Sequence, residues 1–447
     1  MSKSSRYLAI DILCQWQQAG HPLDLLMEPR LQQVADPRDR NLLKAMVFGA
    51  LRELGTLDWV LGRLSSTPLA RLKPTILQAL RIGAYQLLCL ERVPASAAIH
   101  ATVEAVKDMG EPRWLAGFVN GVLRNVGRQR QDLLDLLQTG QAPEEAVFNH
   151  PAWLVQRWRN RYGAQGMAAI CRSNNEPARL CLRVNTLKIA VPDFINALAA
   201  RQLHGEPGRY LPEAVWLDQV GAIADLPGYG EGWFLIQDEV AQLIASLLLP
   251  FPAGDCLDGC AGLGGKTATL STLVPEGVTV VAVEPEARRQ RLFQENMARL
   301  GLTAITLFAG TIADYAAKRR DPLAAVLIDA PCSGLGVTGR HPDIRWQRTE
   351  ADLRSFQEKQ LAILLAAAPL LAPDGVLVYA TCSSEPEENE AVVARFQEVC
   401  PSFVIESAAL SLPQSARQLV DGDGFLRTTP GPDGSDGFFA ARLRRKP

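Results

Sequence analysis

The chain has 447 residues, of which 47% are hydrophobic, so it can bury at least two cores, and this length predicts roughly three domains. Its formal net charge is only −2, which excludes attraction of nucleic acid by the field of the whole molecule and leaves that task to local basic patches. Its nine cysteines form no CxxC pair and no metal-ligand spacing, which predicts neither a metal site nor a disulfide framework.

The first part of the chain has the pattern of a helical bundle. The N-terminal sequence MSKSSRYLAI lacks the apolar core of a signal peptide, and no apolar run reaches the ~20 residues of a membrane helix, so a cytoplasmic protein without membrane spans is expected. From residue 6 to about 130, apolar residues recur at helical spacing, as in Leu8, Ile12 and Trp16. This part is predicted to be all-α.

The middle of the chain contains several segments with different predicted secondary structure. Residues 131–151 are polar, contain Pro and Glu, and are predicted to be a linker. Residues 152–180 look helical, residues 181–188 alternate like a strand, and residues 191–220 suggest a small α+β unit.

From residue 255 onward, predicted strands and helices alternate, as in VTVVAVE (278–284), AVLIDA (325–330) and GVLVYAT (375–381). Such alternation predicts a doubly wound parallel sheet. The C-terminal segments FVIESAAL, GFLRTTP and GFFAARLRR instead suggest a strand and a final antiparallel hairpin.

A glycine-rich turn joins the first of these strands to a helix, in the sequence LDGCAGLGGKT (257–267). A P-loop would need glycine where Cys260 stands, and the dinucleotide pattern GxGxxG would need its last glycine at Thr267. The remaining alternative resembles motif I of S-adenosylmethionine (SAM)-dependent methyltransferases. Glu284, at the end of the next strand, is placed to accept hydrogen bonds from ribose hydroxyls.

Two cysteines follow the carboxyl ends of predicted strands, Cys332 in AVLIDAPCSG and Cys382 in GVLVYATCSS. The two strands are predicted to be sheet neighbours, so that both thiols and Asp329 line one crevice. Methylation at carbon 5 of a pyrimidine needs such groups, because a thiolate must first add to carbon 6 and a carboxyl group must support the adduct at N3. Asp329 suits the N3 position.

The blocks that carry this chemistry resemble the NOL1/NOP2/Sun family of RNA cytosine-C5 methyltransferases over residues 230–445. They are QDEVAQLI (237–244), DGCAGLGGKT (258–267), DAPCSGLGV (329–337), HPDIRW (341–346) and TCSSEPEENE (381–390). The resemblance implies that Cys382 is the nucleophile and that Cys332 serves product release. It also implies SAM contacts at Cys260, Ala261, Gly262, Leu263, Gly264, Gly265, Lys266, Glu284 and Asp329.

The chain departs from the family pattern at two places. Leu263 replaces a proline that stiffens the turn in the family. Gly310 and Thr311 stand where the family often has an acidic residue for the adenine amino group, so Thr311 or Asp314 is expected to substitute.

The N-terminal part resembles NusB, an all-helical RNA-binding fold, in PASAAIHATVEAVK (94–107) and FVNGVLRNV (118–126). The resemblance implies three domains: a NusB-like domain (1–140), a linker with a small α+β RNA-binding subdomain (141–236) and a Rossmann-like catalytic domain (237–447). The combination is similar to bacterial enzymes that methylate 16S ribosomal RNA, with cytosine 967 as the implied target. The implied substrate is that RNA, naked or in an early small-subunit precursor, with no obligate protein partner and a monomeric enzyme.

Several basic residues are candidates for RNA contact. Arg113, Arg124, Arg128 and Arg130, together with Asn120, could form one stripe along the helical part. A second arginine group spans residues 157–183. The residues of HPDIRW follow the catalytic loop and are expected to help shape the pocket of the target base.

Two other functions stay open at this stage. An RNA-binding assembly factor that has lost activity would explain the departures at Leu263 and Gly310. A small-molecule methyltransferase is the third alternative, and the helical part and the arginine-rich middle disfavour it.

Overall fold

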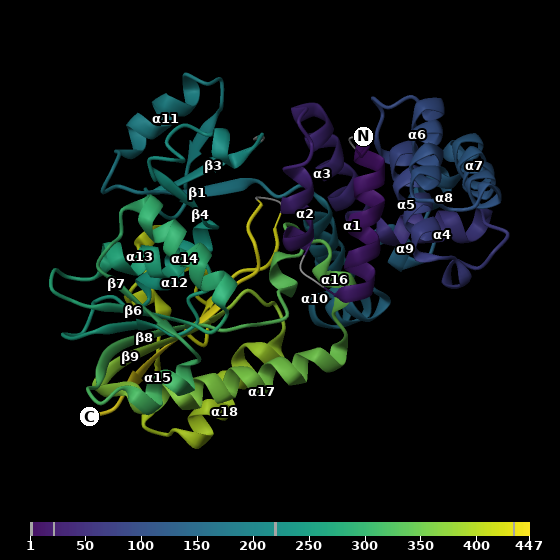
Figure 1. Ribbon diagram of the computed structural model, residues 1–447. Helices are drawn as coiled ribbons and strands as arrows, with labels where there is room; N and C mark the ends of the chain where they lie inside the picture. The colour runs from purple at the N-terminus through teal and green to yellow at the C-terminus, as the bar shows by residue number, and fades with distance from the viewer. Residues whose placement is uncertain (1–2, 21–22, 219–220, 432–433) are drawn as a thin grey trace. The chain divides into compact units, whose positions relative to one another are not determined.

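The structure is a computed structural model that describes residues 3–20, 23–218, 221–431 and 434–447 (Figure 1). The chain divides into two compact units, Met1–Pro177 with Thr338–Arg348, and Ala178–Val337 with Thr349–Pro447. The division into three domains at residues 140 and 236 stays a prediction.

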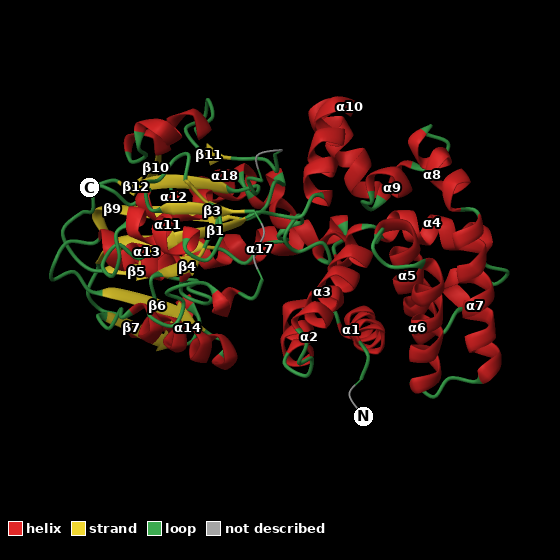
Figure 2. Cartoon of the chain, turned by 90° about the horizontal axis from the view of Figure 1, so that it is seen from above, coloured by secondary structure: helices red, strands yellow, loops and turns green. Residues whose placement is uncertain are grey.

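The first unit is built from helices (Figure 2), as predicted. They are α1 (Ser5–Ala19), α2 (Leu23–Leu31), α3 (Pro37–Arg52), α4 (Leu54–Leu64), α5 (Pro74–Cys89), α6 (Ala95–Asp108), α7 (Arg113–Arg128), α8 (Arg130–Gln138), α9 (Glu144–Phe148) and α10 (Ala152–Asn175). Helix α5 is central and packs against α1, α3, α4, α6 and α7. Apolar side chains occur on most faces of α5, which is typical of a helix buried in a core, and Ile76, Leu80 and Ile82 are fully buried.

The segment predicted as a linker, residues 131–151, is largely helical, because it contains α9 and most of α8. Each of these short helices buries an apolar side chain, Leu133 on α8 and Ala146 on α9. The linker prediction was therefore wrong, since the polar composition reflects the exposed faces of two short helices.

A distant segment completes the first unit. Residues 338–348, which include α16 (Ile344–Gln347), belong to it although the strands on both sides in sequence belong to the second unit. The Arg345 guanidinium is fully buried and donates to the carbonyls of Asn149, Asn174 and Thr338. Trp346 donates its indole N–H to the carbonyl of Leu51 at 2.8 Å.

The second unit contains two sheets. The smaller has the order β2-β3-β1-β4, with all neighbours antiparallel. Its elements are β1 (Leu180–Val184), α11 (Val191–Ala199), β2 (Gly205–Pro207), β3 (Ala214–Leu217) and β4 (Phe234–Ile236). Phe194 of α11 and Phe234 of β4 pack in its core, with ring centroids 5.4 Å apart. This is the predicted small α+β unit.

The larger sheet has the order β10-β12-β9-β8-β5-β6-β7, with β11 paired to β12. Its strands are β5 (Cys256–Asp258), β6 (Val280–Glu284), β7 (Ile305–Ala309), β8 (Leu323–Asp329), β9 (Leu371–Thr381), β10 (Phe403–Glu406), β11 (Leu426–Arg427) and β12 (Phe439–Arg445). Strands β5 to β9 run parallel, whereas β12 is antiparallel to β9, β10 and β11. The Rossmann-like class and the C-terminal antiparallel hairpin are thereby confirmed.

Helices cover both faces of this sheet. They are α12 (Glu239–Ser246), α13 (Gly265–Leu273), α14 (Ala287–Leu300), α15 (Ile312–Lys318), α17 (Glu350–Ala367) and α18 (Glu390–Val399). One face of β8 and β9, with Val326 and Leu377, packs in a core with α15, α17 and α18. The alternate residues Leu327 and Val378 pack in another core with α12 and α13. The near-continuous apolar runs of these strands follow from burial on both faces.

The register of the parallel strands positions the candidate site. Strands β8 and β9 are neighbours, and Asp329 pairs with Ala380, so both strands end at the same level. Strand β5 lies on the other side of β8, which brings the glycine-rich turn to the same edge.

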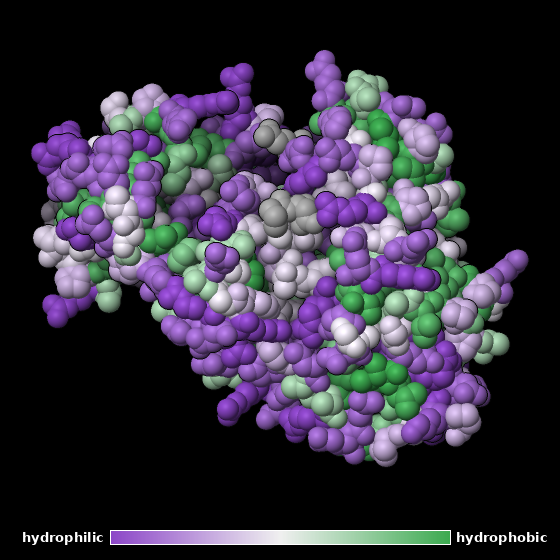
Figure 3. Space-filling model, turned by 180° about the vertical axis from the view of Figure 1, so that it is seen from behind, coloured by the Kyte–Doolittle hydropathy of each residue, from purple (hydrophilic) through white to green (hydrophobic). Residues whose placement is uncertain are grey.

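Hydrophilic residues predominate on the face of the molecule in Figure 3. In the described part of the chain no helix has the length and apolar character needed to cross a bilayer.

Candidate active site

The glycine-rich turn leaves β5 and enters α13 at Gly265. Gly264 has a left-handed backbone with φ of 87°, and a Cβ atom there would lie 2.6 Å from the Met297 side chain and 2.8 Å from Phe293. Gly262 is also left-handed, with φ of 56°, but faces open space. Only glycine satisfies both requirements at position 264, and the open side at position 262 leaves the backbone accessible to a ligand.

Glu284 ends β6 directly beside this turn and is 3% exposed. Its Oε2 accepts from the amide of Gly262 at 3.0 Å, and its Oε1 accepts from the amide of Glu286 at 2.8 Å. The carboxylate is therefore fixed across the turn, where each oxygen retains acceptor capacity. A bare backbone, a helix N-terminus and an oriented carboxylate are the features that suit a nucleoside with a ribose diol.

Lys266, in the first turn of α13, donates to Oδ2 of Asp329 at 2.6 Å. Burial lowers the pKa of Lys266, but the charge of Asp329 and the hydrogen bond to it outweigh burial, so the net shift of the pKa is upward. Lys266 is thus a cation at neutral pH, and the charge that Cys382 can carry contributes to the same upward shift. This ion pair joins the glycine-rich turn to the end of β8.

The thiols of Cys332 and Cys382 lie 3.2 Å apart, sulfur to sulfur. Both side chains are partly buried. The hydrogen bond with Cys382 and burial together raise the pKa of Cys332 well above its ordinary value. Cys332 therefore remains a protonated donor at neutral pH, while Cys382 lies next to that donor and within the field of Lys266.

A buried carboxylate holds the two cysteine loops together. Glu388 accepts from the hydroxyls of Ser333 and Ser383, each at 2.5 Å, and from the amide of Ser333 at 2.7 Å. Gln360 of α17 donates to the same carboxylate at 3.1 Å. Burial raises the pKa of Glu388, and the hydrogen bonds from the two serines oppose that rise. Each serine directly follows one cysteine, so Glu388 fixes both thiols through the backbone.

A second carboxylate lies beneath the glycine-rich turn. Asp258 is fully buried and accepts from the hydroxyl of Thr267 at 2.7 Å. Burial raises the pKa of Asp258 to about 6, and the hydrogen bond from Thr267 opposes the rise. Because the bond spans the turn, Asp258 supports its shape from below.

The structure brings together Asp329, Cys332, Cys382, Lys266 and Glu284 at one edge of the sheet, with the turn from Cys260 to Gly265 between them. Two residues of the turn differ in environment, because Ala261 is buried whereas the Leu263 side chain is 49% exposed.

Thr311 and Asp314 cap the N-terminus of α15. The hydroxyl of Thr311 accepts from the amide of Asp314, and the Asp314 carboxylate accepts from the amide of Thr311 at 2.9 Å, which is a reciprocal capping arrangement. Gly310 precedes this cap. Whether either polar side chain contacts an adenine stays a prediction, and both are already hydrogen-bonded to each other.

Two residues of the HPDIRW block belong to the first unit. Arg345 and Trp346 make their hydrogen bonds inside the first unit, and the Arg345 side chain is not exposed to solvent. The expectation that Arg345 lines a base pocket was wrong, since its side chain is fully buried and donates to polar atoms of its own unit. For Trp346 the expectation stays a prediction.

Sequence reasoning missed Glu388, Ser333 and Ser383 as a group. Their signal was present in the blocks DAPCSGLGV and TCSSEPEENE, where each cysteine is followed by serine and the second block is rich in Glu. An acidic run is usually solvated, and only the fold shows that Glu385 and Glu388 are buried and that Glu388 contacts both serines.

Three family models match successive parts of the chain. A family model described as 16S rRNA methyltransferase RsmB/F matches residues 245–444. The NusB family model matches residues 3–128, and a model for the ferredoxin-like domain of RsmF/B-like methyltransferases matches residues 150–224.

Individual relatives cover the whole chain. The ribosomal RNA small subunit methyltransferase B of Salmonella arizonae is 36% identical over 443 residues, which is 99% of this chain and 98% of the relative. Among solved structures, the protein PH0851 is 22% identical with a TM-score of 0.82 and full coverage of both chains. NSun6 from Pyrococcus horikoshii is 21% identical with a TM-score of 0.58, over 66% of this chain and 98% of its own. The two structures support the fold.

Proposed function

Because the chain belongs to the RsmB/F family of SAM-dependent 16S ribosomal RNA methyltransferases, we propose that it methylates carbon 5 of a cytosine in that RNA through a covalent adduct with Cys382. Cytosine 967 is the proposed target, on the resemblance of the chain to the family. A cytoplasmic location and a monomeric enzyme are part of the same proposal.

One observation carries this proposal: the two thiols lie 3.2 Å apart beside the Lys266–Asp329 ion pair. A methyltransferase that acts on oxygen or on an exocyclic nitrogen needs no thiol, because those atoms are nucleophiles themselves. Carbon 5 of cytosine becomes nucleophilic only when a thiolate adds to carbon 6, so a cysteine at the site favours carbon 5. A second thiol is then available for a separate step.

In the proposed reaction the sulfur of Cys382 forms a bond to carbon 6, while Asp329 faces N3 and stabilises the resulting enamine. Carbon 5 then carries both the new methyl group and its original proton. A base takes that proton, the electron pair left on carbon 5 restores the carbon 5–carbon 6 double bond, and the bond between carbon 6 and the sulfur of Cys382 breaks, which releases Cys382 as a thiolate. Cys332, which faces the sulfur of Cys382, is positioned to assist this last step.

SAM supplies the electrophilic methyl group when bound. The fit of this cofactor rests on the open backbone at Gly262, the N-terminus of α13 and the carboxylate of Glu284. We assign to the same site the remaining turn residues Cys260, Ala261, Leu263, Gly264, Gly265 and Lys266, together with Asp329. Gly310 and Thr311 are assigned to the adenine end, where backbone groups would replace the acidic side chain common in the family.

The test is transfer of labelled methyl from SAM to protein-free 16S RNA, followed by nuclease digestion and chromatography of the nucleosides. Wild-type chain should place the label in 5-methylcytosine, and Cys382→Ala should place none. Cys400→Ala is the matched control, because Cys400 is also a partly buried free thiol of the second unit but lies beyond α18. Full activity of Cys382→Ala would refute the assignment of the nucleophile, and label in another nucleoside would refute the carbon 5 reaction.

The alternative of an assembly factor without activity makes a different prediction. Such a chain would fail to bind SAM in calorimetry, whereas the proposed enzyme binds it through Glu284. If wild-type chain binds SAM but transfers no methyl to protein-free RNA, an early small-subunit precursor is the substrate to test next.

A further inference from the structure

The chain passes from the second unit into the first at Thr338 and returns to the second at Thr349. We call residues 338–348 the strap. It begins six positions after Cys332, and it contains α16 (Figure 1). The strap therefore joins the loop of one active-site thiol to a helical unit that holds no residue of the proposed methyl-transfer site.

Arg345 anchors the strap inside the first unit. Its buried guanidinium donates to the carbonyls of Asn149, which precedes α10, and Asn174, in the last turn of α10, at 3.1 and 2.7 Å. It also donates to the side-chain oxygen of Asn175 at 2.6 Å and to the carbonyl of Thr338 at 3.0 Å. One side chain thus ties the first residue of the strap to both ends of α10.

The end of α3 holds the strap at two further points. Arg52, the last residue of α3, donates to the carbonyl of Gly339 at 3.2 Å. The indole N–H of Trp346 donates to the carbonyl of Leu51 at 2.8 Å. The strap is therefore fixed near its start and near its end.

The anchoring of the strap is costly. Burial and the nearby charge of Arg52 lower the pKa of Arg345 to about 9, because both disfavour its charged form. Apolar side chains could fill the same volume without that cost, but they could not hold carbonyl oxygens at defined positions. The cost is expected where the exact position of the strap matters.

Gly336, two residues before the strap, is fixed against the second cysteine loop. Its amide donates to the carbonyl of Cys382 at 3.0 Å, and its carbonyl accepts from the amide of Gly437 at 2.7 Å. A Cβ atom at this position would overlap the carbonyl oxygen of Gly437, so only glycine allows the close approach. The backbone of Cys382 is thereby bound to the chain segment that leads into the strap.

The two fixed points have no slack between them. The amide of Gly336 is bound to Cys382, the carbonyl of Thr338 is bound to Arg345, and Val337 alone lies between these residues. Two residue steps span about 7 Å at most, whereas a flexible linker absorbs motion only over many residues. A displacement of Thr338 is therefore passed to the backbone of Cys382.

We propose that Arg345 is a positioning residue for methyl transfer, which fixes the backbone of Cys382, and with it the distance between the two thiols, through Thr338, Val337 and Gly336. The proposal rests on the proposed function for the role of Cys382 as the nucleophile. Glu388 supports the same two loops through Ser333 and Ser383, so the link through Gly336 is a second, independent support. The first unit thus contributes to the chemical step itself.

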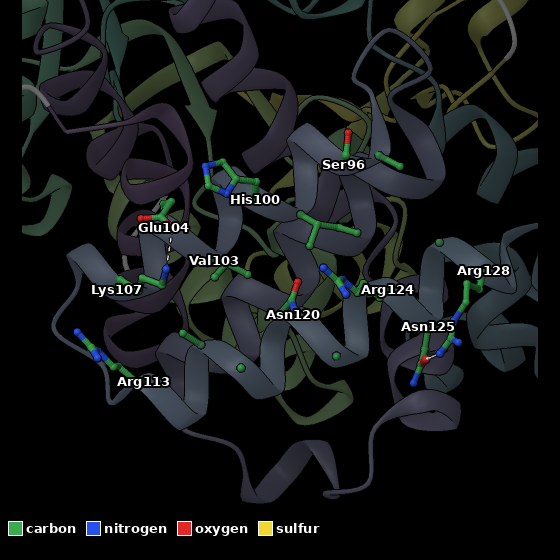
Figure 4. Close-up of a pocket in the computed structure, with 16 residues that line it drawn as sticks. Ser96, His100, Val103, Glu104, Lys107, Arg113, Asn120, Arg124, Asn125 and Arg128 are labelled. Carbon is green, nitrogen blue, oxygen red and sulfur yellow. Dashed lines mark hydrogen bonds and ion pairs between the residues drawn. The ribbon is translucent and has the colours of Figure 1, made fainter.

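The anchors of the strap are separate from the groove between α6 and α7, an open hollow of about 1380 Å³ in the first unit (Figure 4). None of the residues that line this groove belongs to the strap, and Arg52 and Asn174 lie outside it. Arg113 and Arg124 line the groove, and within the described part of the chain no hydrogen bond or ion pair engages their side chains. A substitution there changes the charge of the first unit and leaves the strap intact.

The first test lengthens the link without removing any of its hydrogen-bonding groups. Two glycines are inserted between Val337 and Thr338 in the full chain, so that slack separates the two fixed points. The kcat for methyl transfer from SAM to 16S ribosomal RNA should fall about tenfold. KM for RNA and SAM affinity should stay near their wild-type values, because the residues that bind both ligands are unchanged.

The same insertion between Arg348 and Thr349 is the matched control. It lengthens another crossing between the same two units, and Thr349 keeps its reciprocal cap with Asp352 at the start of α17. Because the link from Gly336 to Thr338 keeps its length, kcat should stay near the wild-type value.

Arg345→Lys tests the anchor itself. Lysine keeps the positive charge but carries one ammonium group in place of a planar fork, so it cannot hold Thr338 and Asn174 in the same geometry. The variant should lower kcat several-fold. It should also slow the formation of a disulfide between Cys332 and Cys382 by diamide, a two-electron thiol oxidant, since that rate depends on the distance between the sulfurs. Arg124→Gln is the control and should leave the rate of disulfide formation unchanged.

Unchanged kcat and disulfide formation after the insertion at Val337 would overturn the proposal, and so would an equal loss of kcat in both insertion variants. If the insertion prevents folding, Arg345→Lys decides: lower thermal stability with unchanged kcat and disulfide formation would show that Arg345 only stabilises the first unit. Failure of the proposed function is separable, because disulfide formation needs neither RNA nor SAM. If Cys382→Ala stays active while the insertion still slows disulfide formation, the link is real and the assignment of the nucleophile is wrong.

Discussion

The sulfur of Cys332 lies 3.2 Å from the sulfur of Cys382, although 50 residues separate the two in the chain. The register between β8 and β9 produces this proximity, because Asp329 and Ala380 are paired, Cys332 comes three residues after Asp329 and Cys382 comes two residues after Ala380. The carbon 5 and carbon 6 atoms of one pyrimidine are bonded neighbours, so two thiols this close can act on one ring.

The first prediction concerns release of the product. Cys332→Ala should trap a covalent complex between Cys382 and the RNA, because the adduct still forms while the step that Cys332 assists is lost. The complex should survive denaturation, migrate slowly in a gel and show the summed mass in mass spectrometry. The double variant Cys332→Ala, Cys382→Ala should give no complex. A freely turning-over Cys332→Ala enzyme would show that another group releases the product.

The second prediction concerns oxidation of the pair. A two-electron thiol oxidant such as diamide should link Cys332 to Cys382, because their sulfurs are already adjacent, and methyl transfer should be lost. Diamide is reduced as the two thiols lose two electrons and two protons. Dithiothreitol should restore activity. Peptide mapping provides the check, with the exposed Cys89 as an internal reference, and an enzyme that is inactivated with the pair still reduced would contradict the prediction.

The third prediction follows from the raised pKa of Cys332. The thiolate is the form that reacts with iodoacetamide, and a raised pKa lowers the thiolate fraction at every pH below it, by about tenfold for each unit. Alkylation of Cys332 should therefore be slow at pH 7–8 and continue to rise above pH 9. The hydrogen bond with Cys382 is the largest cause of the raised pKa, so Cys382→Ala should move the alkylation profile of Cys332 to lower pH. An identical profile in the variant would mean that burial alone controls the reactivity of Cys332.

The sequence predicted much of this arrangement because the apolar patterns are strong. The buried parallel strands β8 and β9 are continuous apolar runs, and the helices of the first unit have apolar residues at regular spacing. The fold class of each part could therefore be predicted from its apolar pattern. The neighbouring position of the two cysteine loops followed from the single helical crossover, and the pairing of Asp329 with Ala380 agrees with it.

Long-range polar contacts could not be predicted, because no local pattern encodes them. Arg345 is separated by 171 positions from Asn174, whose carbonyl accepts from it at 2.7 Å, and nothing near either residue indicates the other. Likewise, Glu388 is one of several glutamates in its block, and Glu385 is equally buried, so only the hydrogen bonds formed in the fold distinguish Glu388 as the partner of both serines. The free state of Arg113 and Arg124 and the bound state of Arg130 also depend on the fold.

The fourth prediction tests the buried guanidinium of the first unit. Arg345→Met should lower the free energy of unfolding of this unit by about 3 kcal/mol, because carbonyls such as that of Asn174 lose a charged donor and stay buried. Tryptophan fluorescence in denaturant reports it, since six of the eight tryptophans belong to this unit. Arg38→Met, at an exposed position, should change the value by less than about 0.5 kcal/mol. Equal stability of the two variants would mean that the hydrogen bonds of Arg345 contribute nothing net.

The fifth prediction concerns Glu388, which holds the loops of both cysteines without touching the reacting atoms. Glu388→Gln keeps the size of the side chain but removes the negative charge that accepts hydrogen bonds from two serine hydroxyls and an amide. Hydrogen bonds to a charged group contribute about 1.5–3 kcal/mol each, so the loops should lose their fixed spacing while the rest of the sheet is retained.

The expected result is a fall in kcat of about tenfold or more, with KM for RNA and SAM affinity near their wild-type values, because the groups that bind both ligands are unchanged. Glu387→Gln is the control, since this neighbouring side chain is partly exposed. The rate of diamide-induced disulfide formation gives an independent readout, because it depends on the distance between the two sulfurs and should also fall in Glu388→Gln. A variant with lower thermal stability but unchanged kcat and unchanged disulfide formation would show that Glu388 stabilises the fold without positioning the thiols.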